Sequence, residues 1–254
     1  MDENKFSFQS QNLVVDYITF KFQHLNTSRQ TEITNYLFKI GFNVYEESGK
    51  LIKPIKQSIL VDLKNRYETC FVQDNLYWKG TLLHFSGSNA AQFYFLAKQN
   101  IIDWQILDTV VLSRFDLYFE RKLKNTDQIS AKAFLAKCQQ ELKQKNKNIR
   151  LEKNNKGFIL KIGNRRTNNY SRIYEGKDSL KFEHEMKGKF LQPYHLLFVE
   201  NNFDNFEQKL SSHFFVYFGK LLPLQYSYLD WLVFKLRPIQ KQSICKNSFN
   251  SDYI

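Results

Sequence analysis

The sequence predicts an α+β fold, a mostly antiparallel sheet with helices on one face and a helical C-terminal part. Two observations support this prediction. Several runs between residues 13 and 188 alternate apolar and polar side chains with the period of a strand, and from about residue 191 the period becomes helical. The chain has 254 residues, of which 43% are hydrophobic, enough for a large core. We expect a main domain over residues 1–200 and a helical extension over residues 201–254.

The N-terminal part alternates predicted strands and helices. Thr27 or Ser28 would cap the first helix and Ser88 the second, because short polar side chains satisfy the free amides there. The expected elements are a strand over 13–22, a helix over 29–41, a hairpin over 68–86 turning at 73–75, and a helix over 88–98.

The clearest strand pattern is LDTVVLSRFDLYFER, residues 107–121. One face would carry Val111, Phe115, Leu117 and Phe119, and the other Arg114, Asp116, Tyr118 and Glu120. A basic amphipathic helix is expected over about 129–146, and a hairpin over 149–166 that turns at 154–157.

Two further strand-like runs, YSRIYEG and LKFEHEMKG, follow between residues 170 and 188. In the first run Tyr170, Arg172 and Tyr174 share a face. In the second, Glu183 and Glu185 lie on the face opposite the apolar side chains. If these runs neighbour the strand over 107–121, one side of the sheet gathers Asp116, Arg172, Tyr174 and an acid.

Such a set has the chemistry for cutting a phosphodiester. A tyrosine hydroxyl can attack phosphorus and form a covalent intermediate. Two carboxylates can hold Mg²⁺ or Mn²⁺, and arginine can grip phosphate oxygens in two places. The alternative is plain: alternating polar residues on an antiparallel strand ordinarily face water.

Composition indicates the class of partner and the cellular compartment of the protein. The formal net charge is +12, which favours an anionic partner, nucleic acid before membrane. The three cysteines, Cys70, Cys138 and Cys245, show neither disulfide nor metal spacing and fit a reducing compartment. No run approaches roughly 18 apolar residues, so no membrane span is expected. We expect a bacterial cytoplasm or, given the bias toward residues with A/T-rich codons, the interior of a plastid or mitochondrion.

The run GFILKIGNRRTNNYSRIYEGKDSLKFEHEMKG resembles the Rep-trans family of rolling-circle plasmid replication initiators and related conjugative-element relaxases. That family carries an IGSR segment, then R-IYDKG, then FE-x-E. Upstream, VVLSRFDLYFE is similar to its ITRIDLAxD strand, LHFSGSNA to ISGxG, and VVDYITFKF to xDWLSxTF. The pieces occur in the family's order over about residues 13–200, so the resemblance implies a nicking and DNA-binding domain over 1–200.

Carried over by position, the resemblance implies Tyr174 as nucleophile and Arg172 as phosphate ligand. It implies Asp116, Glu183 and Glu175 as ligands of Mg²⁺ or Mn²⁺. Members of the family nick one DNA strand, stay joined to its 5′ end and leave a 3′-OH primer. A basic DNA-binding groove beside the site is expected from Arg114, Lys161, Arg165, Arg166, Arg172 and Lys187. Beyond DNA, the partners to test are a second copy of the chain and a helicase.

The sequence departs from the family at the site itself. The lysine after the family's acidic residue is absent, because Gly176 follows Glu175, and the connection to the next strand is short. Whether the chain is an enzyme therefore stays open. A degenerate, non-catalytic nucleic-acid-binding protein of the same fold, as a subunit of a larger assembly, is the alternative. A structural protein whose charge reflects codon bias is the third class.

Overall fold

The computed structural model describes residues 13–23, 25–46, 50–52, 69–72, 80–107, 110–122, 131–143, 148–155, 157–176 and 179–221. Within these ranges the strands form one nine-stranded sheet in the order β2-β3-β4-β1-β5-β9-β8-β7-β6. Neighbouring strands are antiparallel except the parallel pair β2 and β3. The bounds are β1 Val14–Phe22, β2 Tyr45–Glu46, β3 Thr69–Val72, β4 Thr81–Ser86, β5 Val111–Lys122, β6 Ile149–Asn154, β7 Gly157–Gly163, β8 Asn169–Glu175 and β9 Ser179–Lys187. The predicted mostly antiparallel α+β architecture is confirmed.

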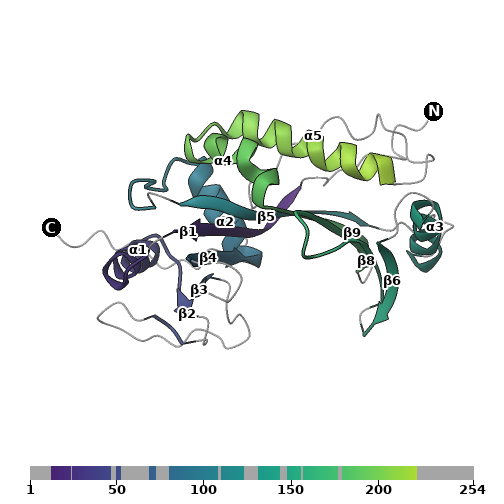
Figure 1. Ribbon diagram of the computed structural model, residues 1–254, viewed down its shortest axis with the longest axis horizontal. Helices are drawn as coiled ribbons and strands as arrows, with labels where there is room; N and C mark the ends of the chain where they lie inside the picture. Colours follow the sequence, from purple (N-terminus) through teal and green to yellow (C-terminus); the bar gives the residue numbers. More distant parts are fainter. Residues whose placement is uncertain are drawn as a thin grey trace.

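The helices supply the cover for the apolar face of this sheet. Figure 1 shows α4 and α5 above the bent sheet and α3 beyond its right-hand end. On that face Phe20 packs against Phe93 of α2, and Phe182 against Phe218 of α5. The helices span α1 Thr27–Lys39, α2 Gly87–Lys98, α3 Ala131–Lys143, α4 Gln192–Val199 and α5 Phe203–Leu221, with a short 3₁₀ turn at Gly188–Leu191.

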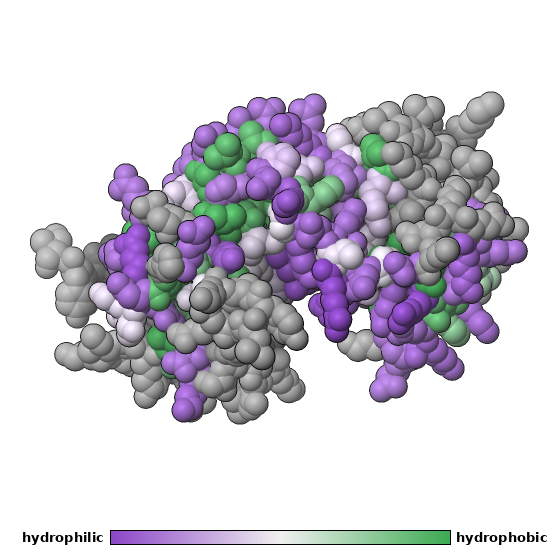
Figure 2. Space-filling model, in the orientation of Figure 1, coloured by the Kyte–Doolittle hydropathy of each residue, from purple (hydrophilic) through white to green (hydrophobic). Residues whose placement is uncertain are grey.

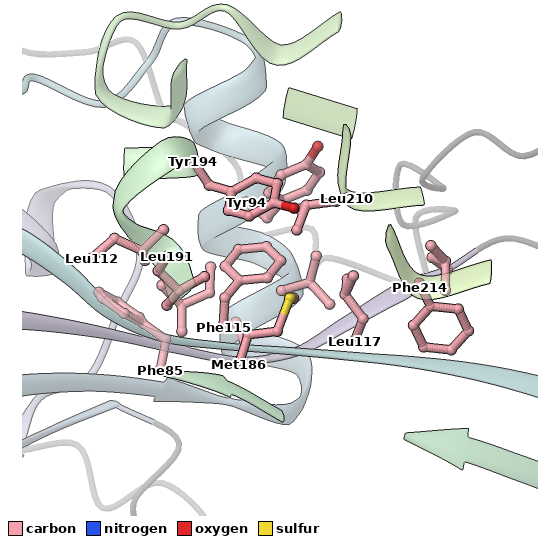
Figure 3. Packing of buried hydrophobic residues seen from close by; sticks show 14 of the residues in the cluster. Phe85, Tyr94, Leu112, Phe115, Leu117, Met186, Leu191, Tyr194, Leu210 and Phe214 are labelled. Atoms are coloured by element: carbon pink, nitrogen blue, oxygen red, sulfur yellow. The ribbon is translucent and has the colours of Figure 1, made fainter. Parts of the chain in front are cut away.

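The core lies between the helices and the centre of the sheet. Figure 3 shows Phe115, Leu117 and Met186 rising from β5 and β9 toward Tyr94 and Leu210 on the helices. Tyr94 has a polar end, and its hydroxyl donates to Glu207, which Lys98 also binds. Burial of this aromatic-rich layer is the main force that holds the helices to the sheet.

Helix α5 belongs to this same core. It contributes Phe206, Leu210, Phe214 and Phe218 to the cluster that also contains the sheet residues. The N-terminal turns of the proposed extension therefore pack on the strands of the main domain. Residues 222–254, the hairpin turn at 73–75 and Lys156 lie outside the described residues.

The predicted helix caps differ from those observed. Helix α1 begins two residues early, and Asn26 rather than Thr27 or Ser28 is its N-cap, with its side chain accepting from the Arg29 amide. Helix α2 has Ser86 at the N-cap position, where its side chain makes no capping hydrogen bond to the first turn, so Ser88 lies inside the helix. Neighbouring Asn, Thr and Ser side chains have similar capping power, so the pattern alone could not select among them.

Val111 does not face the core as the sequence predicts. It is 41% exposed, while Leu112 is buried beside α4 and donates its amide to His195 Nδ1. The register of β1 and β5 shifts between the pairs Thr19–Arg114 and Phe20–Leu112. An extra residue in β5 therefore reverses the alternation there, the usual consequence of a β-bulge.

Among the described helices, none is both long enough and apolar enough to cross a membrane.

Candidate functional site

Charged and aromatic side chains gather on the sheet face opposite the helices, which we call the open face. In Figure 2 the described surface on the inner side of the bend is mostly hydrophilic. From β1, β5, β8 and β9 the open face receives Asp16, Tyr17, Arg114, Asp116, Tyr118, Tyr170, Arg172, Tyr174, Lys181, Glu183, Glu185 and Lys187.

The strand register brings the predicted residues together. Strands β5, β9 and β8 are consecutive neighbours, with Asp116 opposite Glu185 and Glu183 opposite Arg172. Residues that pair directly share a face, as do residues two apart on one strand. Asp116, Glu183 and Tyr174 therefore lie on one side of three adjacent strands, as the sequence predicts.

Arg114 links two of the buried acids. Its Nε and Nη2 donate to Asp116 Oδ1 and Oδ2 at 2.9 and 2.5 Å, and Nη2 also donates to Glu185 Oε2 at 2.9 Å. Both carboxylates are 1% exposed, whereas Arg114 is 17% exposed. Burial raises the pKa of Asp116 to about 7, against the hydrogen bonds and charge of Arg114, which lower it. The fold thus holds the Asp116 carboxyl group in a position where its ionised form is unfavourable.

Glu183 lies beside both proposed reactive side chains. Arg172 Nη2 donates to Glu183 Oε1, and Tyr174 lies close enough to Glu183 for the charge of that carboxylate to act on its hydroxyl. Burial, followed by the charges of Glu183 and Asp16, raises the pKa of Tyr174, while Arg172 lowers it. The neutral hydroxyl is therefore the stable form, and it lies beside a carboxylate that can accept its proton.

Basic residues converge on Glu185 from the rim. Lys187 forms an ion pair with Glu185 Oε1, and Arg165 Nε lies 3.5 Å from Oε2. Arg165 belongs to the turn after β7, in which the Arg166 amide donates to Asn164 Oδ1. Of the predicted DNA-binding residues, Arg114, Lys161 and Lys187 lie on strands of the open face and Arg165 and Arg166 in this turn.

Glu175 does not join the other predicted metal ligands. It follows Tyr174 on β8, so strand alternation turns its side chain to the opposite face. There its carboxylate lies against Gly157 and accepts a long 3.4 Å hydrogen bond from the Phe158 amide. The proposed grouping of Glu175 with Asp116 and Glu183 is therefore wrong, because one position along a strand exchanges the faces.

Asp16 is a member of the site that the sequence analysis missed. The register of β1 shifts between Val15 and Tyr17, a bulge that lets Asp16 and Tyr17 both reach the open face. Burial and then the charge of Glu183 raise the pKa of Asp16, so the two carboxyl groups are close enough to repel. A lone acid in the apolar run VVDYITFKF was the available signal.

The charges of the open face are layered. Asp116 and Glu185 are each 1% exposed and Glu183 3%, whereas Arg172 is 26%, Lys187 29% and Arg165 60% exposed. Solvent therefore meets a basic layer that lies over buried acids. An anionic ligand would contact the cations first.

The donor chemistry of the site fits a hard divalent cation. Mg²⁺ and Mn²⁺ prefer carboxylate oxygens, which Asp116, Glu183 and Glu185 provide. Glu185 Oε1 is buried and, within the part of the chain that the structure describes, accepts no hydrogen bond, although Lys187 forms an ion pair with it. Within the described ranges, however, no group of three or more His, Cys, Asp or Glu side chains is arranged around one metal position. The oxygens instead pair with arginine and lysine.

No family model matches the chain, and no curated protein matches it in sequence. Among solved structures, the rolling circle replication initiator protein from Geobacillus stearothermophilus matches with a TM-score of 0.48 and 14% sequence identity. The match covers 80% of this chain and 83% of that chain.

Proposed function

We propose that the protein is a replication-initiator-like DNA-binding enzyme that nicks one strand through Tyr174 and leaves a 3′-OH primer. One observation carries the proposal. The Arg172 guanidinium binds the buried Glu183, and the register of β8 and β9 places the Tyr174 hydroxyl on the same basic sheet face, near Glu183 and the buried Asp116. This supplies a nucleophile, a base and a phosphate ligand within one patch.

In the proposed reaction the Tyr174 oxygen attacks phosphorus and the bond from phosphorus to the 3′ oxygen breaks. Glu183 accepts the phenolic proton as the new bond forms, which is needed because burial disfavours a free phenolate. Arg172 binds the phosphate oxygens. The leaving 3′ oxygen takes a proton from water, so the products are a 5′-phosphotyrosine and a free 3′-OH, and the reverse reaction rejoins the strand.

We further propose that Asp116 and Glu183, with Glu185 replacing the misassigned Glu175, hold Mg²⁺ or Mn²⁺. When bound, such an ion would polarise the phosphate and stabilise the leaving oxygen. Because it competes with Arg114 and Arg172 for these carboxylates, metal binding should release the arginines toward the DNA phosphate.

Covalent capture tests the proposed nucleophile. Wild-type protein is incubated with Mn²⁺ and supercoiled or single-stranded labelled DNA, and adducts are resolved on a denaturing gel. Tyr174→Phe keeps the ring and its packing but lacks the hydroxyl. It should lose the adduct while DNA binding and thermal stability stay near wild type.

Tyr170→Phe is the matched control, because Tyr170 lies four residues away on the same face of β8. It should retain the adduct. An adduct that persists in Tyr174→Phe and disappears in Tyr170→Phe would reassign the nucleophile to Tyr170. No adduct on either substrate would favour the second function, a non-catalytic nucleic-acid-binding protein. The Arg172–Glu183 and Arg114–Asp116 ion pairs, which already neutralise the site without a metal, are compatible with that function.

A further inference from the structure

Two tyrosines of the open face, outside the proposed catalytic set, each carry a cation on the ring. The Arg114 guanidinium lies 3.9 Å from the Tyr17 ring centroid, and the Lys181 ammonium lies 3.9 Å from the Tyr118 ring centroid. Both tyrosines are half-buried. Their rings are therefore partly open to solvent and are positioned by the strands beneath them.

The register places these rings beside the catalytic patch. Tyr118 pairs with Glu183, which pairs with Arg172, so the three side chains form one row across β5, β9 and β8. With strands about 4.8 Å apart, Tyr118 lies roughly 10 Å from Arg172. Tyr17 lies on β1, the strand beyond β5, where it pairs with Asp116. It is therefore farther than Tyr118 along the direction from β8 toward β1. This separation suits a phosphate at Arg172 and the base of an adjacent nucleotide at Tyr118.

Charge and chemistry restrict the occupant. Lys181 and Arg114 each lie within 3.9 Å of a ring centroid, so an anionic backbone meets a cation at each ring on which one of its bases can stack. Bases stack on aromatic side chains only when they are unpaired, because in a duplex their faces are already stacked. Aromatic rings interleaved with cations on an exposed sheet thus fit a single strand.

We propose that Tyr118 and Tyr17 are base-stacking subsites for single-stranded DNA that crosses the sheet from β8 toward β1. The inference rests on the proposed function for the direction of the strand, with the scissile phosphate at Arg172. The ring, not the hydroxyl, makes the contact. Lys181 and Arg114 contact the flanking phosphates, and the unpaired bases select a single strand over a duplex.

The test measures binding without catalysis. Fluorescence anisotropy of a labelled oligothymidylate of about 20 nucleotides is recorded without added metal. Tyr118→Phe should bind as wild type, because it keeps the ring. Tyr118→Leu fills similar volume without a π face and should weaken binding about 5- to 150-fold, the range for one stacked base. Tyr17→Phe and Tyr17→Leu should behave in the same way, and a matched duplex should be bound more weakly than the single strand.

Phe158 provides the matched control. It is also half-buried, with Lys132 and Lys153 near its ring at 5.4 and 6.0 Å, but it lies on the opposite face of β7. Phe158→Leu should leave affinity for the oligothymidylate unchanged. Circular dichroism melting shows which variants are folded, and at each position the affinities of the folded Leu and Phe variants are compared; a position whose Leu variant does not fold leaves the test to the other position.

The outcomes separate the two proposals. Equal affinities of the Leu and Phe variants at both positions would overturn the stacking subsites, even if Tyr174 forms its adduct. Loss of affinity in the Leu variants without any adduct would uphold the subsites while the nicking activity failed. A duplex that binds the wild type as tightly as the single strand does would overturn the preference for a single strand.

Discussion

At the scale of single residues, Arg114 binds two almost fully buried carboxylates, Asp116 and Glu185. Arg114→Ala would leave both carboxylates, which are shielded from solvent, without this partner. We expect it to lower the free energy of unfolding by about 3–5 kcal/mol, the usual cost of breaking a buried pair. Urea denaturation at neutral pH measures the change.

A second variant separates this charge effect from lost packing. Arg114→Lys keeps a cation but cannot form the two-pronged contact with Asp116, so its loss of stability should be intermediate. Arg166 is exposed, and Arg166→Ala should change stability by about 0.5 kcal/mol or less. Equal small effects at Arg114 and Arg166 would show that Arg114 does not stabilise the buried acids.

Metal binding gives a prediction about the carboxylates themselves. Asp116→Asn and Glu183→Gln keep shape but lose the charge that holds a hard cation. With Mn²⁺ added, the melting temperature of the wild type should rise and that of each variant should rise less, a readout that needs no DNA. Glu175→Gln is the matched control, because its side chain lies on the other face, and it should respond as the wild type does.

The residues of the site were partly predictable. Asp116, Arg172, Tyr174 and Glu183 follow from two-residue alternation, which survives wherever a strand is regular. Asp16 could not be placed, because a bulge in β1 changes which face it meets and leaves no mark in the residue pattern. The resemblance placed Glu175 in the site by its position in the sequence. Sequence position does not say which face of a strand a side chain lies on, so this placement was wrong.

At the scale of elements, a polar network holds β8 and β9 together behind the site. Ser171 and His184 pair across these strands on the helix face, with 2.7 Å between Ser171 Oγ and His184 Nδ1. His184 Nε2 lies 3.2 Å from His213 Nε2 on α5, and the Tyr217 ring packs against the His184 ring at a tilt of 37°. The network fixes the strand pair that carries Arg172 and Glu183, so its integrity should matter to the open face.

This network predicts a pH effect on stability. Burial lowers the pKa of His184 to about 3, with a smaller effect of His213. The unfolded chain takes up a proton near pH 6.5 and the folded chain does not. The stability that neutral His184 confers is therefore complete above about pH 6.5 and is lost as the pH falls. His184→Gln should be less stable than wild type near pH 7.5, and the gap should narrow toward about pH 5.

The comparison with His184→Gln isolates one group. Asp116 acts in the opposite sense, because its raised pKa lets the folded chain bind a proton that the unfolded chain releases between about pH 4 and 7. Asp116 is present in both proteins, so its contribution cancels in their difference. Lys132→Gln, on the exposed side of α3, should show a gap that does not change with pH. A constant gap for His184→Gln would contradict the burial of a neutral imidazole.

At the scale of the whole molecule, the helices and the charges divide the sheet between two tasks. One face is buried under aromatic-rich helices and supplies stability, which frees the other for polar side chains that would be unfavourable in a core. The sequence predicts this division, because period two along β5 and β9 separates the faces. The strand order does not follow from sequence, because it is set by which apolar faces pack together and not by local pattern.

The same division predicts where DNA binds. If the basic layer of the open face contacts phosphates, affinity for single-stranded DNA should fall as salt rises, with a log–log slope of about −0.7 for each phosphate contact. Arg165→Ala combined with Arg166→Ala should reduce the magnitude of that slope by about 1.4, the contribution of two phosphate contacts, and leave stability nearly unchanged.

Lys132→Ala combined with Lys137→Ala is the control, because it removes the same charge from exposed positions on α3, which packs on the other face. Because long-range attraction falls off within about 10 Å at 0.1 M salt, charge lost from that side should leave the slope unchanged. Equal slope changes in the two double variants would mean that net charge alone, and not the open face, draws the protein to DNA.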